Sequence, residues 1–126
     1  MAKRILAIDD DPVIREILQV MLQAEGYEVV PVESGVAALD MLQSMGGSSS
    51  FSLILLDNQM PGMNGFEVLC KLKEQPETEK TPVIMLTAED KPEDIMTGYS
   101  VGAEYYITKP FTREQLMYGL KMVLGK

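Results

Sequence analysis

The sequence predicts an α/β protein built on a doubly wound sheet of five parallel strands. Short apolar runs alternate with helical patterns five times along the 126 residues. Strands that are separated by helices run parallel, and right-handed crossovers place the helices on both faces of the sheet. Five units are too few for a closed barrel of about eight strands. The length suits one domain, so we expect residues 1–126 to form a single domain.

The first two strand–helix pairs are predicted from an apolar strand followed by residues that typically cap a helix. Residues 4–9 (RILAID) form an apolar strand, and Asp11 and Pro12 are typical of a helix N-cap and first helical residue. Residues 28–32 form a strand whose proline favours a sheet edge. Ser34 then caps a second helix that runs to about residue 45. The first helix carries one apolar stripe, made of Val13, Ile14, Ile17, Leu18, Met21 and Leu22.

The middle of the chain contains the most apolar strand. Residues 46–50 (GGSSS) predict a flexible surface loop, to which we attach no function. Residues 52–57 (SLILLD) follow, and their apolar character predicts a central strand. A turn-rich loop leads to a helix over about 66–74, and residues 82–87 (PVIMLT) form another buried strand.

The last third contains two helix-capping patterns. Asp90 and Glu93 form a capping pattern that opens a helix to about residue 100, and residues 104–107 form a short strand. Thr112 and Gln115 form the second capping box. They open the last helix, whose inward residues are Leu116, Leu120, Val123 and Leu124.

The composition excludes several classes of function. A net charge of −8 argues against general affinity for nucleic acid or anionic membranes. The chain has no histidine, which excludes a Ser-His or Cys-His catalytic unit and a phosphohistidine on this chain. No apolar run reaches the roughly 18 residues of a membrane span. One cysteine and no sign of a secretory leader lead us to expect a cytoplasmic location.

Polar residues follow four of the predicted strands, at the edge where such sheets bind ligands. Asp9, Asp10 and Asp11 end the first strand, and Asp57 ends the third. Thr87 ends the fourth strand, and Lys109 follows the fifth. Each residue alone has an ordinary structural role, such as the helix cap expected for Asp11. Together they provide a nucleophile, oxygen ligands for a hard cation such as Mg²⁺, an ammonium group and a hydroxyl donor, which are the parts that phosphoryl transfer requires.

The motifs ILAIDDDP, LILLDNQMPGMNGFEVL, PVIMLTAE and GAEYYITKPF resemble, in order and spacing, the receiver domain of bacterial response regulators. The resemblance covers the chain from about Lys3 onward. It implies the flavodoxin-like (βα)5 arrangement with strand order 2-1-3-4-5. It also implies a signalling domain rather than an enzyme. The only chemistry of such a domain is self-catalysed phosphoryl transfer and hydrolysis.

The resemblance assigns expected roles to the site residues. Asp57 is similar to the family's phosphoryl acceptor. Three aspartates correspond to the family's ligands for Mg²⁺ or another divalent cation such as Mn²⁺. Asp10 is similar to the direct carboxylate ligand, Asp9 assists, and Asp57 also belongs to the set. The backbone carbonyl of Gln59 is similar to a further ligand. Thr87 completes the set as a contact to the phosphoryl oxygens, together with the lysine at position 109.

The resemblance also implies a switch. Thr87 moves toward the phosphoryl group, Tyr106 is the switch aromatic, and the Lys109–Pro110 peptide bond is usually cis. The face formed by the fourth helix, the fifth strand and the last helix then changes. Expected partners are a sensor histidine kinase or histidine phosphotransfer protein, and a downstream target or output domain. We expect no direct binding of nucleic acid or membrane, and a monomer or a phosphorylation-dependent dimer.

The departures from the family pattern are few. Asn58 and Gln59 stand where many relatives have an apolar residue, and Glu89 follows Thr87 by two positions. We expect these polar groups to alter the lifetime of the phosphoryl group rather than the ability to accept it. The loop 46–50 is slightly long for the family.

Three alternatives remain open from the residues. Asp9 to Val13 also fits a haloacid-dehalogenase-type phosphatase with Asp9 as nucleophile, although a later acidic cluster for Mg²⁺ is missing and the chain is short for that fold. A flavodoxin-like electron carrier is disfavoured because three carboxylates would repel a flavin phosphate. The third alternative is an interaction module that is never phosphorylated.

Docking residues are expected on the last third of the chain. Met-rich surfaces with tyrosines suit adaptable partners. At helical spacing, however, Met96 and Met117 favour core positions, and Cys70 favours a small buried hydrophobic role. The candidates are Met96, Tyr99, Tyr106, Met117, Tyr118 and Lys121.

Overall fold

A computed structural model gives the structure of the chain. It describes residues 3–45, 51–58, 60, 62–76, 78–88, 96 and 100–125. Five sequence-based expectations therefore lie outside the described residues: the loop 46–50, Gln59, Glu89, the capping pattern of Asp90 and Glu93, and Tyr99. Of the helix expected to end near residue 100, residues 96, 100 and 101 are described, and they are helical.

The described residues form a five-stranded parallel sheet in the order β2-β1-β3-β4-β5. This result confirms the predicted fold class. The strand that contains Pro31 lies at an edge, as its proline predicts, because proline cannot donate a ladder hydrogen bond. The strands are β1 (Arg4–Ile8), β2 (Glu28–Val32), β3 (Phe51–Asp57), β4 (Val83–Thr87) and β5 (Tyr105–Thr108).

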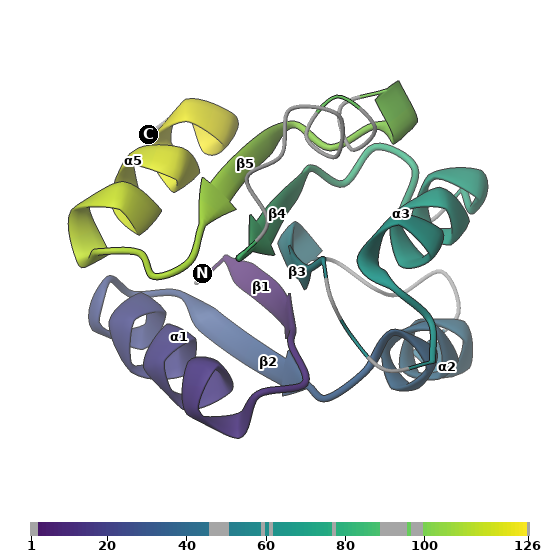
Figure 1. Ribbon diagram of the computed structural model, residues 1–126, viewed down its shortest axis with the longest axis horizontal. Coiled ribbons are helices and arrows are strands. Elements are labelled where there is room, and N and C mark those ends of the chain that lie inside the picture. The colour runs from purple at the N-terminus through teal and green to yellow at the C-terminus, as the bar shows by residue number, and fades with distance from the viewer. Residues whose placement is uncertain are drawn as a thin grey trace.

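Helices cover both faces of the sheet (Figure 1). In this view α1 and α5 lie on one side, and α2 and α3 lie on the other. Two separate hydrophobic clusters fill the two faces, with Leu6, Ile54 and Met85 in one and Ile5, Leu53 and Ile84 in the other. The described helices are α1 (Pro12–Ala24), α2 (Gly35–Met45), α3 (Gly65–Glu74) and α5 (Arg113–Leu124).

The central strands are apolar on both sides because helices cover both faces. Every side chain from Leu53 to Leu56 is fully buried, and β3 pairs with β1 on one side and β4 on the other. The register aligns the carboxyl ends, with Ile8 opposite Leu56 and Asp57 opposite Leu86. The residues that follow these strands therefore meet at one edge of the sheet.

The predicted caps of three helices are confirmed. Asp11 accepts a hydrogen bond from the backbone of Val13, and Ser34 accepts one from Ala37. Thr112 and Gln115 form the predicted capping box at the start of α5. The helix α3 begins one residue before its predicted start, because Asn64 caps it in a box with Glu67.

Four strands differ from their predicted bounds by one residue. The third begins at Phe51 rather than residue 52, and the fourth begins at Val83 rather than residue 82. The first ends at Ile8 rather than Asp9, whose side chain turns to the backbone of Asp11. The fifth runs from Tyr105 to Thr108 rather than from Glu104 to residue 107. The Glu104 carboxylate accepts a hydrogen bond from the backbone of Val83 at 2.8 Å, so this residue closes the start of β4 instead of extending β5.

Three predicted core positions are wrong. Cys70 is exposed, because the buried stripe of α3 is formed by Gly65, Val68, Leu69 and Leu72 and position 70 points away from it. Val13 is 61% exposed, since it lies roughly 140° around the helix from the buried Leu18. Met96 is 68% exposed, and helical spacing alone did not tell which side of its helix faces the sheet.

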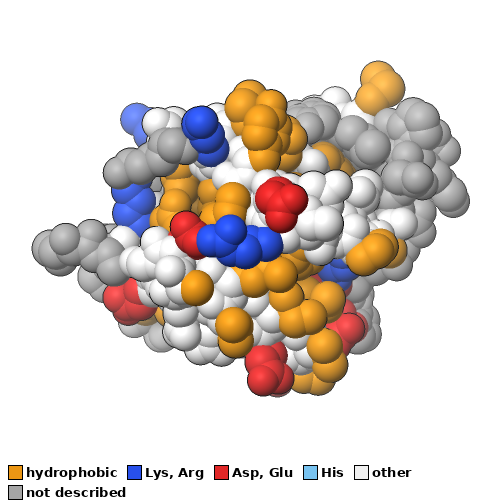
Figure 2. Space-filling model, turned by 90° about the vertical axis from the view of Figure 1, so that its left-hand side faces the viewer, with side chains coloured by type: hydrophobic (Ala, Val, Ile, Leu, Met, Phe, Trp, Pro, Cys, Tyr) orange, Lys and Arg blue, Asp and Glu red, His pale blue; other side chains and the backbone are white. Residues whose placement is uncertain are grey.

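The surface mixes side-chain types. The face in Figure 2 intersperses hydrophobic side chains with acidic and basic ones. Exposed hydrophobic residues occur on α1, at Val13 and Val20, and on α5, at Tyr118 and Met122. Within the described part of the chain, no helix is both long and apolar enough to cross a membrane.

Candidate functional site

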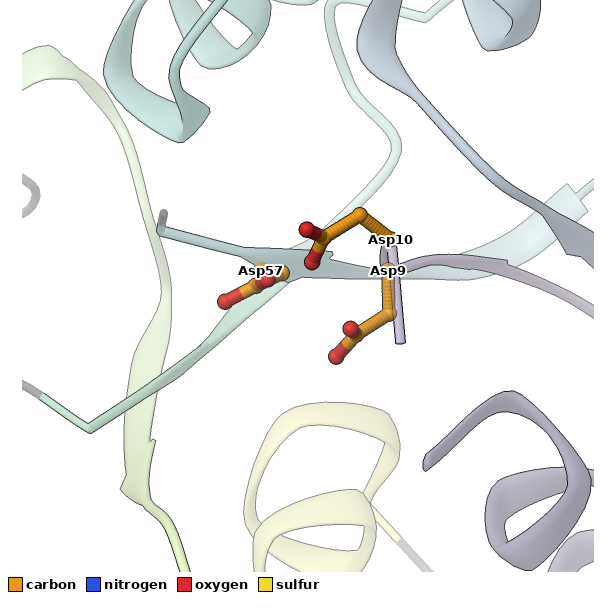
Figure 3. A group of neighbouring side chains, drawn as sticks. All are labelled: Asp9, Asp10 and Asp57. Carbon is orange, nitrogen blue, oxygen red and sulfur yellow. The ribbon is translucent and has the colours of Figure 1, made fainter. Parts of the chain in front are cut away.

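Three carboxylates converge beyond the ends of β1 and β3. Asp9, Asp10 and Asp57 each offer one oxygen atom, and these oxygens lie within 4.8 Å of one another. Figure 3 shows the three side chains pointing to the same side of the two strand ends. Asp9 and Asp57 are buried, whereas Asp10 is exposed, so the cluster opens to solvent on one side.

Asp9 is held by contacts from the start of α1. Its Oδ1 accepts a hydrogen bond from the backbone of Asp11 at 2.9 Å. Its backbone carbonyl accepts one from Arg15 Nη1 at 2.8 Å. Its backbone N–H donates to the Val32 carbonyl at 3.1 Å, which ties the residue to the edge strand. The orientation of the Asp9 carboxylate is therefore fixed before any ligand arrives.

Lys109 supplies the positive charge among these carboxylates. Its Nζ lies 2.7 Å from Asp9 Oδ2 and 3.3 Å from Asp57 Oδ1. Burial, the largest influence, lowers the pKa of Lys109, but the hydrogen bonds and charges of Asp9 and Asp57 together outweigh it and raise the pKa above its ordinary value. The ammonium group therefore stays charged throughout the neutral range.

Thr87 lies at the end of β4 and is fully buried. Its carbonyl accepts a hydrogen bond from the Lys109 backbone at 2.8 Å, which brings the lysine into the site. Its Oγ1 lies 3.1 Å from Asn58 Nδ2. The peptide bond between Lys109 and Pro110 is cis, as the resemblance implied.

The structure brings most of the predicted residues to one edge. Asp9, Asp10, Asp57 and Lys109 form one connected group through the distances above, and Thr87 adjoins it. Tyr106 lies on β5, half-buried against the hydrophobic cluster that includes Met85. The position of Gln59 lies outside the described residues.

Sequence reasoning missed two contacts of this site. Arg15 was not singled out, although its place in the first turns of α1 brings it back toward the end of β1. Asn58 was noted as a departure, but its hydrogen bond to Thr87 was not predicted. That contact joins residues 29 positions apart, so only the pairing of β3 with β4 reveals it.

The donor set fits a hard divalent cation. Carboxylate oxygens are the ligands that Mg²⁺ prefers, and the site combines three carboxylates with a single ammonium group among its described residues. The exposed side at Asp10 would admit a cation with bound water. The geometry thus defines a class of protein, an α/β domain with an acidic, lysine-containing site at the carboxyl edge of its sheet.

Comparisons with known proteins identify the family. The response regulator receiver domain model matches residues 5–121. The chain is similar to the chemotaxis protein CheY4 of Vibrio cholerae, with a TM-score of 0.90 and 36% identity over 98% of this chain and 99% of that one. The chain belongs to the response regulator receiver domain family.

Two curated relatives are longer proteins. The chain is 40% identical over 120 residues to the uncharacterized transcriptional regulatory protein YkoG of Bacillus subtilis, covering 95% of this chain and 50% of YkoG. It is 37% identical over 126 residues to the phosphate regulon transcriptional regulatory protein PhoB of Escherichia coli, covering 100% of this chain and 53% of PhoB. The chain thus spans about half the length of these relatives. The match favours a receiver over the phosphatase and electron-carrier alternatives.

Proposed function

We propose that this receiver domain accepts a phosphoryl group on Asp57 from a phosphohistidine of a partner kinase or phosphotransfer protein. The observation that carries the proposal is the convergence of buried Asp57 with Asp9, Asp10 and Lys109 at the carboxyl edge of the sheet. The chain has no histidine, so the donor histidine lies outside residues 1–126.

The chemistry is a displacement at phosphorus. A carboxylate oxygen of Asp57 forms a bond to the phosphorus atom while the phosphorus–nitrogen bond of the donor breaks, and the leaving imidazole takes up a proton. Lys109 balances charge on the phosphoryl oxygens from its place beside Asp57, and the Thr87 hydroxyl donates a hydrogen bond to one of them. Hydrolysis of the acyl phosphate by water returns the Asp57 carboxylate and inorganic phosphate.

Asp9, Asp10 and Asp57 would hold Mg²⁺ or Mn²⁺ at this site. The fit of three convergent carboxylates supports this assignment, and the backbone carbonyl of Gln59 is a further expected ligand. When bound, such a cation supplies positive charge opposite the phosphoryl oxygens. In its absence, Lys109 partly neutralises the cluster through its contacts with Asp9 and Asp57.

The proposed output is a change of surface. Thr87 turns toward the phosphoryl group, and the Tyr106 ring turns inward behind it. The position of Tyr106 on β5, next to the strand that ends in Thr87, supports this coupling. The face that includes β5 and α5 then changes, and it is where a downstream target or output domain would dock.

We further propose that residues 1–126 act as one domain that contacts a kinase and an output partner. The domain itself would bind no nucleic acid, for which its net charge of −8 is unfavourable. It would be a monomer or a dimer that forms on phosphorylation. Transcriptional regulators such as PhoB are about twice as long as this chain. The proposal therefore concerns the receiver domain and not the output of a whole protein.

Labelling with a small phosphodonor tests the acceptor function. We expect acetyl phosphate with Mg²⁺ to add one phosphoryl group per chain, seen in the intact mass, and a chelator to prevent it. Asp57→Asn should abolish the adduct. Asp40→Asn, which changes an exposed carboxylate on α2, is the matched control and should label like the wild type.

The opposite results would overturn the proposal. A wild type that stays unlabelled by acetyl phosphate and by phosphorylated histidine kinases would be an unphosphorylated interaction module. An adduct that forms equally well in the presence of chelator would contradict the role given to the three carboxylates in holding a cation.

A further inference from the structure

Asn58 places a buried amide beside the acceptor aspartate. It directly follows Asp57, and only 5% of the residue is exposed. Its Nδ2 donates to Thr87 Oγ1 at 3.1 Å, and Thr87 is itself fully buried. The two side chains therefore meet where water does not compete for the hydrogen bond, a setting in which such a bond has a larger effect than it does at the surface.

The backbone of Asn58 is fixed on two sides. Its N–H donates to the Leu86 carbonyl at 3.1 Å, and its carbonyl accepts from the Gly65 N–H at 2.9 Å. A Cβ atom at Gly65 would lie 2.7 Å from the Asn58 Cα, so the start of α3 packs directly against this residue. Asn58 cannot shift without disturbing both the pairing of β3 with β4 and the first turn of α3.

The hydrogen bond constrains the Thr87 hydroxyl. A hydroxyl has one hydrogen to donate and two lone pairs to accept, and an amide nitrogen can only donate. The Asn58 contact therefore occupies a lone pair of Oγ1 and fixes the position of that oxygen. Because Asn58 is anchored, a movement that carries Thr87 away from it and toward a phosphoryl group on Asp57 would lengthen this bond.

We propose that Asn58 is a positioning residue that holds the Thr87 hydroxyl in its unphosphorylated position and so opposes the switch. The inference rests on the proposed function and deepens it. A contact present in one state and lost in the other shifts the equilibrium toward the first state, and by linkage weakens binding of any ligand that favours the second.

The test measures the affinity of beryllofluoride, a non-covalent phosphoryl mimic, in the presence of Mg²⁺ by calorimetry. Asn58→Leu removes the donor with little change in size. We expect it to raise the affinity about fivefold, at the low end of allosteric couplings. Asn58→Ala also removes the amide, and we expect it to raise the affinity for beryllofluoride as well. Thermal unfolding of each variant reports whether it is folded.

A double-mutant cycle separates positioning from a general structural effect. If Asn58 acts through the Thr87 hydroxyl, then Asn58→Leu has no effect on affinity in the Thr87→Ala background. An affinity that is unchanged or lower in both Asn58 variants would overturn the inference. So would an equal change with and without the Thr87 hydroxyl.

Asp57→Asn keeps this inference distinct from the proposed function. Beryllofluoride binding by the wild type that Asp57→Asn abolishes supports the acceptor role, whatever the Asn58 variants show. A wild type that does not bind beryllofluoride removes the proposed function and this inference together. Binding with no dependence on Asn58 removes this inference alone.

Discussion

Lys109 is the residue on which the charge balance of the site depends. It contacts the fully buried Asp9 at 2.7 Å and the proposed acceptor Asp57 at 3.3 Å. A buried carboxylate without a cation is costly, because burial removes the water that stabilises its charge. The lysine therefore contributes to folding as well as to the proposed chemistry.

Replacement of Lys109 tests this contribution. We expect Lys109→Met to lower the free energy of unfolding by about 3 kcal/mol at pH 7, because it leaves Asp9 buried and unpaired. Urea unfolding measures the change. Lys71→Met, at an exposed position of α3, is the control and should change stability by no more than about 0.5 kcal/mol. Equal losses in the two variants would contradict the role of the ion pair.

The raised pKa of Lys109 fixes the pH range of this effect. Because the folded-state pKa lies above the ordinary lysine value of about 10.4, the ion pair contributes fully below that pH and is lost as pH rises through the folded value. The stability difference between wild type and Lys109→Met should thus be constant from about pH 7 to 9 and shrink only above about pH 10. A difference that already disappears at pH 8 would contradict the raised pKa.

The residues that form the site could be predicted from the sequence, but the contacts between their side chains could not. The sequence placed Asp9, Asp10, Asp57, Thr87 and Lys109 at one sheet edge, and the structure brings them together there. It did not predict that Lys109 contacts Asp9 more closely than Asp57. Such a contact spans 100 positions and depends on how the β5–α5 connection packs, which no local pattern encodes.

At the scale of elements, cap chemistry explains which boundaries could be predicted. Thr112 and Gln115 follow the usual capping-box pattern, and α5 begins after Thr112 as predicted. Asn64 with Glu67 uses asparagine in the same way and was missed, so α3 starts one residue early. The bounds of β5 were wrong by one residue because the Glu104 carboxylate bonds across to β4, a tertiary contact.

The capping box of α5 yields a test of element stability. Thr112→Ala removes the acceptor for the Gln115 backbone N–H, which lies at 3.1 Å, and should cost about 1 kcal/mol in the free energy of unfolding. Thr112→Ser retains the oxygen and should recover most of the loss. If urea unfolding finds the alanine and serine variants equally stable, the hydrogen bond does not contribute.

The junction of β3 with α3 requires a glycine. A Cβ at Gly65 would lie 2.5 Å from the Asp57 carbonyl oxygen and 2.7 Å from the Asn58 Cα, both of them backbone atoms. We expect Gly65→Ala to lower stability by about 2 kcal/mol, because backbone cannot move aside as a side chain can. Urea unfolding measures the loss, and the shift would also move the backbone of Asp57.

Gly119→Ala is the matched control for that junction. A Cβ at Gly119 would meet only side-chain atoms, of Ile107 at 2.9 Å and Tyr105 at 3.2 Å. These side chains can give way, so the loss should be smaller than for Gly65→Ala. A Gly65→Ala variant that is as stable as the wild type would show that α3 can start further from β3.

At the scale of the whole molecule, the fold follows from the alternation of apolar strands with helices. A parallel sheet with helices on both faces accounts for the buried runs of β1, β3 and β4, and the strand that contains proline is one of its two edge strands. Strand order itself came from the resemblance, since the same alternation permits more than one order. The exposed Cys70 and Met96 show that composition alone does not decide which side of a helix is buried.

The proposed role of this domain depends on which aspartate carries the phosphoryl group. Borohydride reduces an aspartyl phosphate to homoserine, a stable product that peptide mass mapping can locate. The measurement is to label the wild type with acetyl phosphate and Mg²⁺, reduce it, and map the modified residue. We expect homoserine at position 57 and unmodified aspartate at positions 9 and 10. Homoserine at position 9, with Asp57 intact, would contradict it and favour a phosphatase-like nucleophile at Asp9.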